Sequence, residues 1–241
     1  MGRAPMSVAG AEYVRAMAAR SSDRLAREAF QQLALSLVNP GATVFDFGAG
    51  PGIDARYYAE RGLAVSAYDV DPAMCAYFAQ ECADLIRAGR VVLVGGPYGD
   101  FLRPRSEAGG GRADLITANF APLNLVGDLR PLFAKFHDLT PSGGRLLASV
   151  LSPCFVGDLR YGWWWRNVGR LLRTGDFSVP GTQAPIVRRR LSSYAAQCEP
   201  YFVLERVYRG LPSRSGGSRP GRWAWLRGTT SQFIFLLFRR R

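Results

Sequence analysis

A glycine-rich turn that directly follows a short apolar segment constrains the fold of this chain more than any other feature. The segment Thr43-Val-Phe-Asp-Phe47 predicts a buried strand, and the next five residues, Gly48-Ala-Gly-Pro-Gly52, contain three glycines. Glycine has no Cβ and tolerates positive φ, so a ligand can approach the backbone of such a turn closely. A helix is predicted to begin directly after Gly52. We therefore expect a ligand site between the end of this strand and the start of the helix.

Predicted strands and helices alternate over the first 150 of the 241 residues. Strands are predicted over residues 43–47, 63–68, 90–94, 113–118 and 145–151. Helices are predicted over residues 21–38, 53–61, 73–88 and 127–139. This alternation predicts an α/β fold in which a mostly parallel sheet carries helices on both faces.

The pattern loosens after Pro153. A helix is predicted over about residues 161–173, where Trp163 to Trp165 and regularly spaced arginines give it two different sides. Loops are predicted over residues 174–185 and 211–222, the second of them mobile, and a short helix is predicted from about residue 192. Strands are predicted over residues 186–191, 202–208 and 230–239.

Charge is distributed unevenly along the chain. Residues 1–150 contain 15 basic and 15 acidic residues, whereas residues 151–241 contain 16 arginines and four acidic residues, so the second part carries the whole formal charge of +12. All five tryptophans also lie in the second part. Lys135 is the only lysine beside 30 arginines, which fits codon bias in a GC-rich genome as well as selection for guanidinium groups. The hydrophobic content of 48% excludes a mainly disordered chain.

Two classes of ligand use a glycine-rich turn of this kind. Dinucleotide-binding enzymes require G-x-G-x-x-G, but here Ile53 occupies the third glycine position. Asp46 lies within the strand just before the glycines, where a carboxylate suits a cationic ligand better than a pyrophosphate. The acidic-x-Gly-x-Gly-x-Gly arrangement resembles motif I of the class I methyltransferases that use S-adenosylmethionine, and Asp69 resembles the acidic residue of that family at the end of the second strand.

The resemblance extends over about residues 20–150, strand by strand, and is typical of small bacterial methyltransferases that act on metabolites. It implies a Rossmann-like methyltransferase fold, with a mostly parallel seven-stranded sheet and an antiparallel C-terminal strand. It also implies a single domain with three parts: an N-terminal helical lid (1–40), the S-adenosylmethionine-binding core (41–152), and a substrate-capping segment with the last two sheet strands (153–241).

The same resemblance assigns roles to the cofactor-binding residues. The turn Gly48, Ala49, Gly50 and Gly52 would form the floor under the methionine part of the cofactor, and Asp46 would organise this turn and the cofactor ammonium group. Asp69 would accept hydrogen bonds from the ribose hydroxyls, and Val70 would flank the adenine. Asn119 and Phe120 would lie near the methyl group. Many family members carry an acidic residue just after the third strand, but this chain reads Gly95-Gly-Pro-Tyr98, so the adenine contact falls either to the backbone near Gly96 or to Asp100.

Methyl transfer needs a general base only when the nucleophile arrives protonated. The residues that we expect near the mouth of the site are Tyr13, Tyr98, Asp100 and Tyr161. His137, the only histidine, falls late in a predicted helix on the far side of a strand–helix–strand unit, and we expect a surface or helix-end role for it. No metal site is predicted.

The basic, Trp-rich second part leaves three alternatives open. It favours a small aromatic or lipophilic substrate, which could carry an anionic group or be tethered to a carrier protein. An RNA substrate is the second alternative, although no known RNA-binding module is present and the neutral first part supplies no continuous basic surface. A membrane-surface or non-catalytic role is the third. Four scattered cysteines and no visible secretory signal predict a soluble, cytoplasmic protein.

Overall fold

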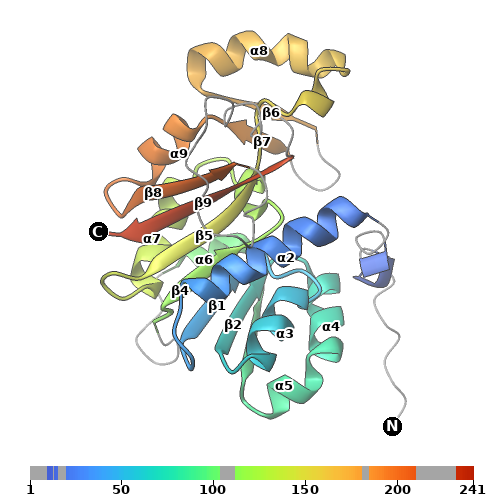
Figure 1. Ribbon diagram of the computed structural model, residues 1–241, viewed down its shortest axis with the longest axis vertical. Coiled ribbons are helices and arrows are strands. Elements are labelled where there is room, and N and C mark those ends of the chain that lie inside the picture. Colours follow the sequence, from blue (N-terminus) through green and yellow to red (C-terminus); the bar gives the residue numbers. More distant parts are fainter. Residues whose placement is uncertain (1–9, 13, 16–19, 104–111, 181–184, 210–231) are drawn as a thin grey trace.

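Five parallel strands form most of a seven-stranded sheet in the computed structural model of the protein (Figure 1). They are β1 (Thr43–Phe47), β2 (Ala64–Asp69), β3 (Val91–Gly95), β4 (Leu115–Ala118) and β5 (Arg145–Leu151). The sheet order is β3-β2-β1-β4-β5-β9-β8, so the order reverses at β1, and ligands of open α/β sheets bind at the carboxyl ends of the strands at such a point. The structure describes residues 10–12, 14–15, 20–103, 112–180, 185–209 and 232–241.

The last two strands complete the sheet beside β5. β9 (Phe233–Arg240) pairs antiparallel with β5 and with β8 (Phe202–Arg209). Because β9 runs against β5, its first residue, Phe233, lies opposite Leu151 at the carboxyl ends of the parallel strands. The prediction of a mostly parallel seven-stranded sheet with an antiparallel C-terminal strand is confirmed.

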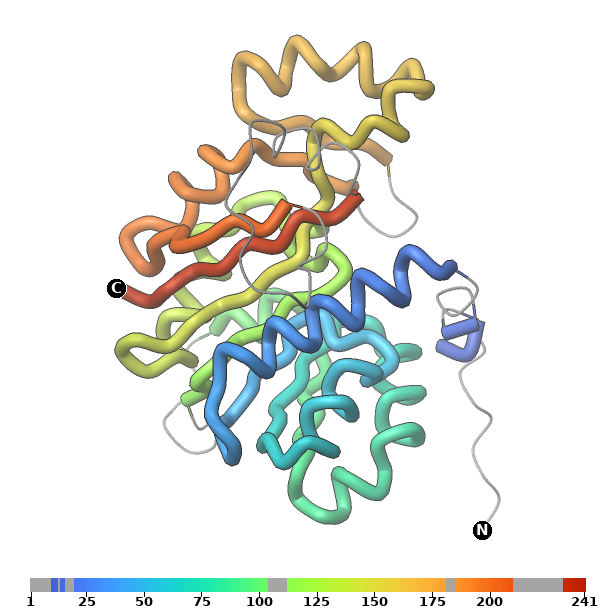
Figure 2. Tube along the Cα trace, viewed as in Figure 1, coloured from blue at the N-terminus to red at the C-terminus, as the bar shows by residue number. Residues whose placement is uncertain are grey.

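Helices cover both faces of the sheet because successive strand residues point to opposite sides. One face carries α2 (Ser21–Ser36), α3 (Ile53–Glu60), α4 (Pro72–Glu81) and α5 (Ala83–Arg87). The other face carries α6 (Tyr98–Leu102), α7 (Arg130–Leu139) and α9 (Leu191–Cys198). In β1, Val44 packs into the first layer and Phe45 into the second. The tube view shows α2 lying across the sheet (Figure 2), and the edge-on contact of Phe30 with Phe235 of β9 fixes it there.

A small additional unit lies at one end of the long axis of the molecule (Figure 1). It consists of the 3₁₀ helix η2 (Val156–Asp158), α8 (Gly162–Thr174), β6 (Asp176–Val179) and β7 (Ile186–Arg189), and we call it the cap. β6 and β7 pair antiparallel in a two-stranded sheet of their own. The loop predicted over residues 174–185 is therefore wrong in its first half, because residues 176–179 form β6.

Arg189 attaches the cap to the main sheet. Its side chain is fully buried and donates to the carbonyl oxygens of Leu123, Val126 and Gly127. These carbonyls belong to η1 (Pro122–Leu125) and the residues directly after it. The side-chain amide of Asn124 adds a second link, since it donates to the Val187 carbonyl at 2.6 Å and accepts from the Leu151 amide at 3.0 Å.

Some predicted elements differ from the structure in detail. The helix predicted over residues 73–88 is interrupted at Cys82, which separates α4 from α5. α6 was not predicted. The predicted mobile loop over residues 211–222 lies outside the described residues, as does part of the predicted N-terminal lid. Within the described residues, no helix has the length and apolar character that a membrane span requires.

Candidate cofactor site

The glycine-rich turn lies at the carboxyl end of β1, and backbone hydrogen bonds fasten it to the neighbouring strand. The amides of Gly48 and Ala49 both donate to the Tyr68 carbonyl, at 2.9 and 3.0 Å. The amide of Gly50 donates to an Asp69 carboxylate oxygen at 2.7 Å. The ends of β1 and β2 are thereby joined into one surface above the sheet.

Two of the glycines serve different purposes. A Cβ on Gly52 would meet the Phe78 ring at 2.8 Å and the Cys82 sulfur at 3.1 Å, so this glycine allows α3 to pack against α4. Gly50 also has a positive φ, +54°, but a Cβ there would meet nothing within 4 Å. The space over Gly50 is therefore open to a ligand, which can lie directly against the backbone.

Three buried carboxylates surround this turn. Asp46 and Asp54 are 2% and 5% exposed, and Asp69 is 8% exposed. Asp69 accepts hydrogen bonds from the Gly50 and Asp71 amides, one on each oxygen, which leaves each oxygen able to accept another. Burial raises the pKa of Asp69, while these amide donors oppose the rise.

Asp46 has one carboxylate oxygen with no hydrogen-bond partner. Its Oδ1 accepts from the Thr117 hydroxyl at 2.8 Å, whereas Oδ2 is buried and unbonded. Burial, and next the negative charge of Asp54, raise the pKa of Asp46 to about 7. A buried carboxylate oxygen without a donor is costly, so a cationic or hydrogen-bonding ligand at this place would stabilise it.

Asp54 is the centre of a hydrogen-bond network that joins α2 to the end of β4. It accepts from the Arg27 guanidinium, from the Gln31 amide at 2.7 Å and from the Asn119 amide at 3.1 Å. Arg27 and Gln31 lie four residues apart on α2 and therefore share a face of that helix. Sequence reasoning missed Arg27, Gln31 and Asp54. The only signal in the sequence was the acidic residue in the first turn of the helix after Gly52.

Asn119 and Phe120 form the next wall of the site, at the end of β4. Asn119 Oδ1 accepts from the Phe120 amide and from the Ser149 hydroxyl, both at 2.9 Å. Phe120 and Ala121 both have positive φ, 60° and 66°, which is a strained conformation for residues with a Cβ. The Phe120 ring lies between the Arg27 guanidinium, 4.4 Å from its centroid, and the Phe233 ring, 5.2 Å away.

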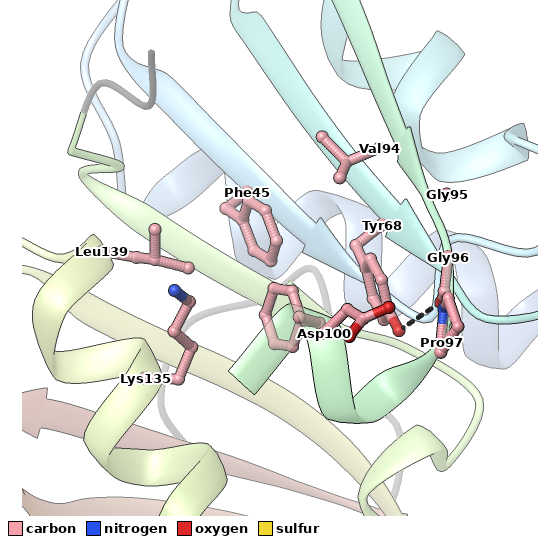
Figure 3. A pocket seen from close by; sticks show the side chains of 10 residues that line it. Phe45, Tyr68, Val94, Gly95, Gly96, Pro97, Asp100, Lys135 and Leu139 are labelled. Carbon is pink, nitrogen blue, oxygen red and sulfur yellow. Dashed lines mark hydrogen bonds between the residues drawn. The ribbon is translucent and has the colours of Figure 1, made fainter. Parts of the chain in front are cut away.

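The residues after β3 border a small cavity of about 110 Å³, seen in Figure 3. The figure shows Tyr68 pointing towards Gly96, and the Tyr68 hydroxyl donates to the Gly96 carbonyl at 2.8 Å. Asp100 also lines this cavity, and its carboxylate makes an ion pair with Arg103 at 3.2 Å. Val70, which follows Asp69, is 54% exposed.

The candidate bases are dispersed. Tyr13 lies outside the described residues. Burial raises the pKa of Tyr98 to about 12, so this phenol stays protonated at neutral pH and is a poor base. Tyr161 belongs to the cap, where it stacks on Trp163. His137 contacts Arg240 at 3.0 Å. Arg240 is next to Arg239, which pairs with Arg145 at the start of β5, so His137 lies at the end of the strands opposite the glycine-rich turn.

This constellation fits S-adenosylmethionine. The cofactor carries a sulfonium and an ammonium group, and Asp46, Asp54 and Asp69 offer three carboxylates beside the open space over Gly50. Arg27 supplies a cation close to the same place, where a carboxylate of the cofactor could pair with it. Among the described residues, no group of histidine, cysteine or acidic side chains could hold a metal ion.

Comparison with known proteins points to methyltransferases. A family model described as a methyltransferase domain matches residues 13–175, more than half of the chain. The chain is also 36% identical over 114 residues to a ribosomal protein L11 methyltransferase of Pelotomaculum thermopropionicum. That match covers 46% of this chain, and the chain spans only a third of the length of this relative.

Solved structures share the fold over nearly the whole chain. A TehB-like S-adenosylmethionine-dependent methyltransferase from Corynebacterium glutamicum superposes with a TM-score of 0.61 at 17% identity, covering 98% of both chains. The 1,6-didemethyltoxoflavin-N1-methyltransferase of Burkholderia thailandensis, solved with 1,6-didemethyltoxoflavin and S-adenosylhomocysteine bound, superposes with a TM-score of 0.59 at 19% identity, covering 100% of this chain and 92% of that one.

Proposed function

The chain belongs to the methyltransferase-domain family, whose cofactor is S-adenosylmethionine, and from this premise we propose that it methylates a small aromatic or lipophilic metabolite. The observation that carries the proposal is the wall formed by Phe120 and Phe233, with Arg27 stacked on Phe120. These groups lie beside Asn119, which belongs to the same network as the buried carboxylates. These aromatic rings suit a flat aromatic or lipophilic substrate, which can pack against them.

The cofactor supplies a methyl group bonded to a positively charged sulfur. When bound, the cofactor would supply this methyl group to a nucleophilic atom of the substrate by in-line displacement, with the neutral thioether as the leaving group. The chain's main task is therefore to align the two reactants at about 3 Å and to exclude water. The strained backbone at Phe120 and Ala121, with the Phe120 amide bonded to Ser149 at 2.7 Å, gives this wall a fixed position.

We assign the cofactor to the residues around the glycine-rich turn. Asp69 would accept from the ribose hydroxyls, Asp46 would face the ammonium group, and the backbone of the turn would support the methionine part. Val70 and Gly96 would border the adenine, whereas Asn119 and Phe120 would border the methyl group. The residues assigned to the cofactor are Asp46, Gly48, Ala49, Gly50, Gly52, Asp69, Val70, Gly96, Asn119 and Phe120.

The use of the arginines supports a small substrate over RNA. In the described part of the cap, Arg188 and Arg189 are 6% and 0% exposed and are bonded to the chain itself, so neither can contact phosphates. The matched solved structure that holds a small-molecule substrate points in the same direction. All four cysteines are free, which supports placing the reaction in the reducing cytoplasm.

Calorimetry with S-adenosylhomocysteine tests the cofactor site. We expect binding in the micromolar range and a loss of about a hundredfold or more in Asp69→Ala, because two charge-assisted hydrogen bonds to the ribose are removed. Asp84→Ala is the matched control, since Asp84 is an exposed carboxylate on α5. Binding of NAD by a protein that ignores S-adenosylhomocysteine would contradict the cofactor assignment.

The substrate class is tested separately with labelled S-adenosylmethionine. We expect label in small phenols, amines or aromatic carboxylates from a mixed metabolite extract. Label that appears in RNA or in ribosomal protein, with none in small molecules, would overturn the proposed substrate class and leave the cofactor assignment intact.

A further inference from the structure

The cap exposes a group of large apolar side chains that the methyl-transfer site does not use. Trp165 and Leu172 of α8 are 60% and 61% exposed. Three further apolar residues that precede or begin α8 are 39–49% exposed, and we call the five together the α8 ridge: Val156, Leu159, Tyr161, Trp165 and Leu172. Large exposed apolar side chains gathered in one short segment indicate a contact with something outside the chain.

The exposure of Trp165 is built into the structure. The indole Nε1 of Trp165 donates to the Leu159 carbonyl at 2.8 Å, and its ring meets the Trp164 ring edge-on at 4.9 Å. An adjacent side of α8, about 100° around the helix, is buried through Trp164 and Leu171, which holds the helix in one orientation. Trp165 and Leu172 are seven residues apart and therefore lie on the same side of the helix, facing solvent.

Exposed arginines follow this ridge around the helix. Arg166, Arg170 and Arg173 lie on the next side of α8, and all three are exposed. Arg160 stands over the Tyr161 ring at 4.8 Å, at the end of the ridge. The acidic residues of the described part of the cap do not offset these charges, because Asp158 is buried against Arg188 at 3.2 Å and only Asp176 remains.

We propose that the α8 ridge binds the surface of an anionic lipid membrane. Trp, Tyr and Leu side chains beside arginines are the chemistry of a helix that lies in the plane of the interface, with apolar groups among the acyl chains and guanidinium groups at the headgroups. The arginine side chains can bury their methylene stems while the charge reaches the phosphates. α8 has 13 residues and lies on the membrane without crossing it.

The position of α8 in the molecule allows this contact. Figure 1 shows α8 along the end of the long axis, on the far side of β6 and β7 from the main sheet. A flat surface can therefore meet α8 without collision with the sheet or with α2. The contact is independent of methyl transfer, and it would bring the cap close to lipophilic compounds dissolved in the membrane.

Two other occupants fit less well. In a twofold dimer through the same face, the arginines of one copy would approach the arginines of the other. RNA would use the arginines and could stack on Trp165, but it has no use for the aliphatic side chains Val156, Leu159 and Leu172. The mixture of aliphatic groups and arginines is explained by a lipid surface.

Vesicle co-sedimentation of the full chain tests the proposal. We expect binding to vesicles of phosphatidylcholine with about one third phosphatidylglycerol, weaker binding at high salt, and little binding to pure phosphatidylcholine. Trp165→Ser/Leu172→Ser should weaken binding by about tenfold or more through lost apolar contact. Arg166→Gln/Arg170→Gln should weaken it by roughly twenty-fivefold, since each arginine near an anionic surface contributes about fivefold.

Matched variants separate the ridge from general charge and hydrophobicity. Arg87→Gln/Arg90→Gln removes the same charge from another exposed region, and Leu25→Ser/Val92→Ser removes two exposed apolar residues of α2 and β3. We expect both to bind within about twofold of the parent protein. Thermal unfolding of each variant shows whether it is folded, and Leu172→Ser alone, which leaves the Trp165 hydrogen bond in place, repeats the test if the double variant is unstable.

Several results would overturn the proposal. One is no binding to anionic vesicles at low salt. A second is equal loss of binding in the ridge variants and in their matched controls, which would reflect net charge alone. A third is retention on RNA or heparin that depends on Arg166 and Arg170 and is unaffected by Trp165→Ser/Leu172→Ser. A fourth is a concentration-dependent dimer that the ridge variants abolish, together with vesicle binding that is no stronger for the parent protein than for the ridge variants.

Discussion

Charged side chains are buried both at the glycine-rich turn and in the cap, and the two regions satisfy them differently. In the cap, Arg189 is fully buried and its guanidinium meets three carbonyl oxygens of the chain. At the turn, Asp46 keeps a buried oxygen without a donor. In the cap, carbonyls of the chain accept from both terminal nitrogens of Arg189 and its Nε has no hydrogen-bond partner, whereas at the turn half of the Asp46 carboxylate is without one. The first pattern belongs to stability and the second to function.

This comparison changes what the uneven charge of the chain means. The 16 arginines after residue 150 would suggest a continuous basic surface if all were exposed. Arg188 and Arg189 instead are buried in the cap. Arg240 contacts His137 and the Thr140 carbonyl at the end of α7. Among the exposed arginines of the described residues, Arg166, Arg170 and Arg173 lie together on α8 beside its apolar ridge.

The largest expected effect concerns the cap. Arg189→Ala should lower the free energy of unfolding by about 4 kcal/mol, because it removes a fully buried guanidinium and leaves the carbonyls of Leu123, Val126 and Gly127 without their donor. Arg190→Ala is the matched control: Arg190 is exposed, and its change should stay within about 0.5 kcal/mol. Urea unfolding followed by circular dichroism measures both. Equal small losses would show that Arg189 does not hold the cap to the sheet, and the contrast between the two regions would fail.

The next effect concerns the turn. Gly50→Ala should weaken S-adenosylhomocysteine binding by roughly thirtyfold, or about 2 kcal/mol, because the added Cβ would project into the space assigned to the cofactor.

Gly41→Ala controls for backbone strain. Gly41 also has a positive φ, +80°, and open space around it. It lies before β1, however, at the end of that strand opposite the glycine-rich turn. Both variants should lose about 1 kcal/mol of stability from the unfavourable φ. Only Gly50→Ala should lose affinity. Calorimetry of both variants makes the comparison, and equal affinities would place the cofactor elsewhere.

The sequence predicts the core well because its signals are local. Strand 43–47, the glycines after it and the strand–helix alternation each depend on neighbouring residues, and the sheet order then follows from the family resemblance. Asp46, Asp69 and Asn119 are positioned by the strand ends on which they lie, so their shared edge could be foreseen.

The parts that escaped prediction depend on contacts between distant segments. Arg27 and Gln31 donate hydrogen bonds to Asp54 only because α2 crosses the sheet. Their spacing along the sequence does not predict this contact. Likewise Arg189 is buried because the cap folds back onto η1, a contact between segments that are distant in the sequence. β6 pairs only with β7 and lacks an apolar run of its own, so it resembled a loop.

The smallest effect tests the charge of the turn by its pH dependence. With a pKa of about 7, Asp46 is largely protonated at pH 6 and largely ionised at pH 8. Ionised Asp46 attracts a cation, so the affinity for S-adenosylmethionine should rise by up to about tenfold over this range. Asp46→Asn should show a weaker, flat profile. Calorimetry at several pH values measures both, and parallel profiles would remove Asp46 from the cation site.

The stability of the cofactor-free protein should change in the opposite direction. Because the pKa of Asp46 in the fold lies above its ordinary value, the folded state binds the proton more tightly than the unfolded chain does. The resulting stabilisation is complete below pH about 4 and is lost as the pH rises through about 7. Relative to the parent protein, Asp46→Asn should therefore gain stability between pH 5 and pH 8, while it loses affinity for the cofactor. Substitution of a residue that only stabilises the fold, such as Arg189 in the cap, would not raise stability while it lowers affinity for the cofactor. Thermal unfolding and calorimetry of the same variants distinguish the two roles.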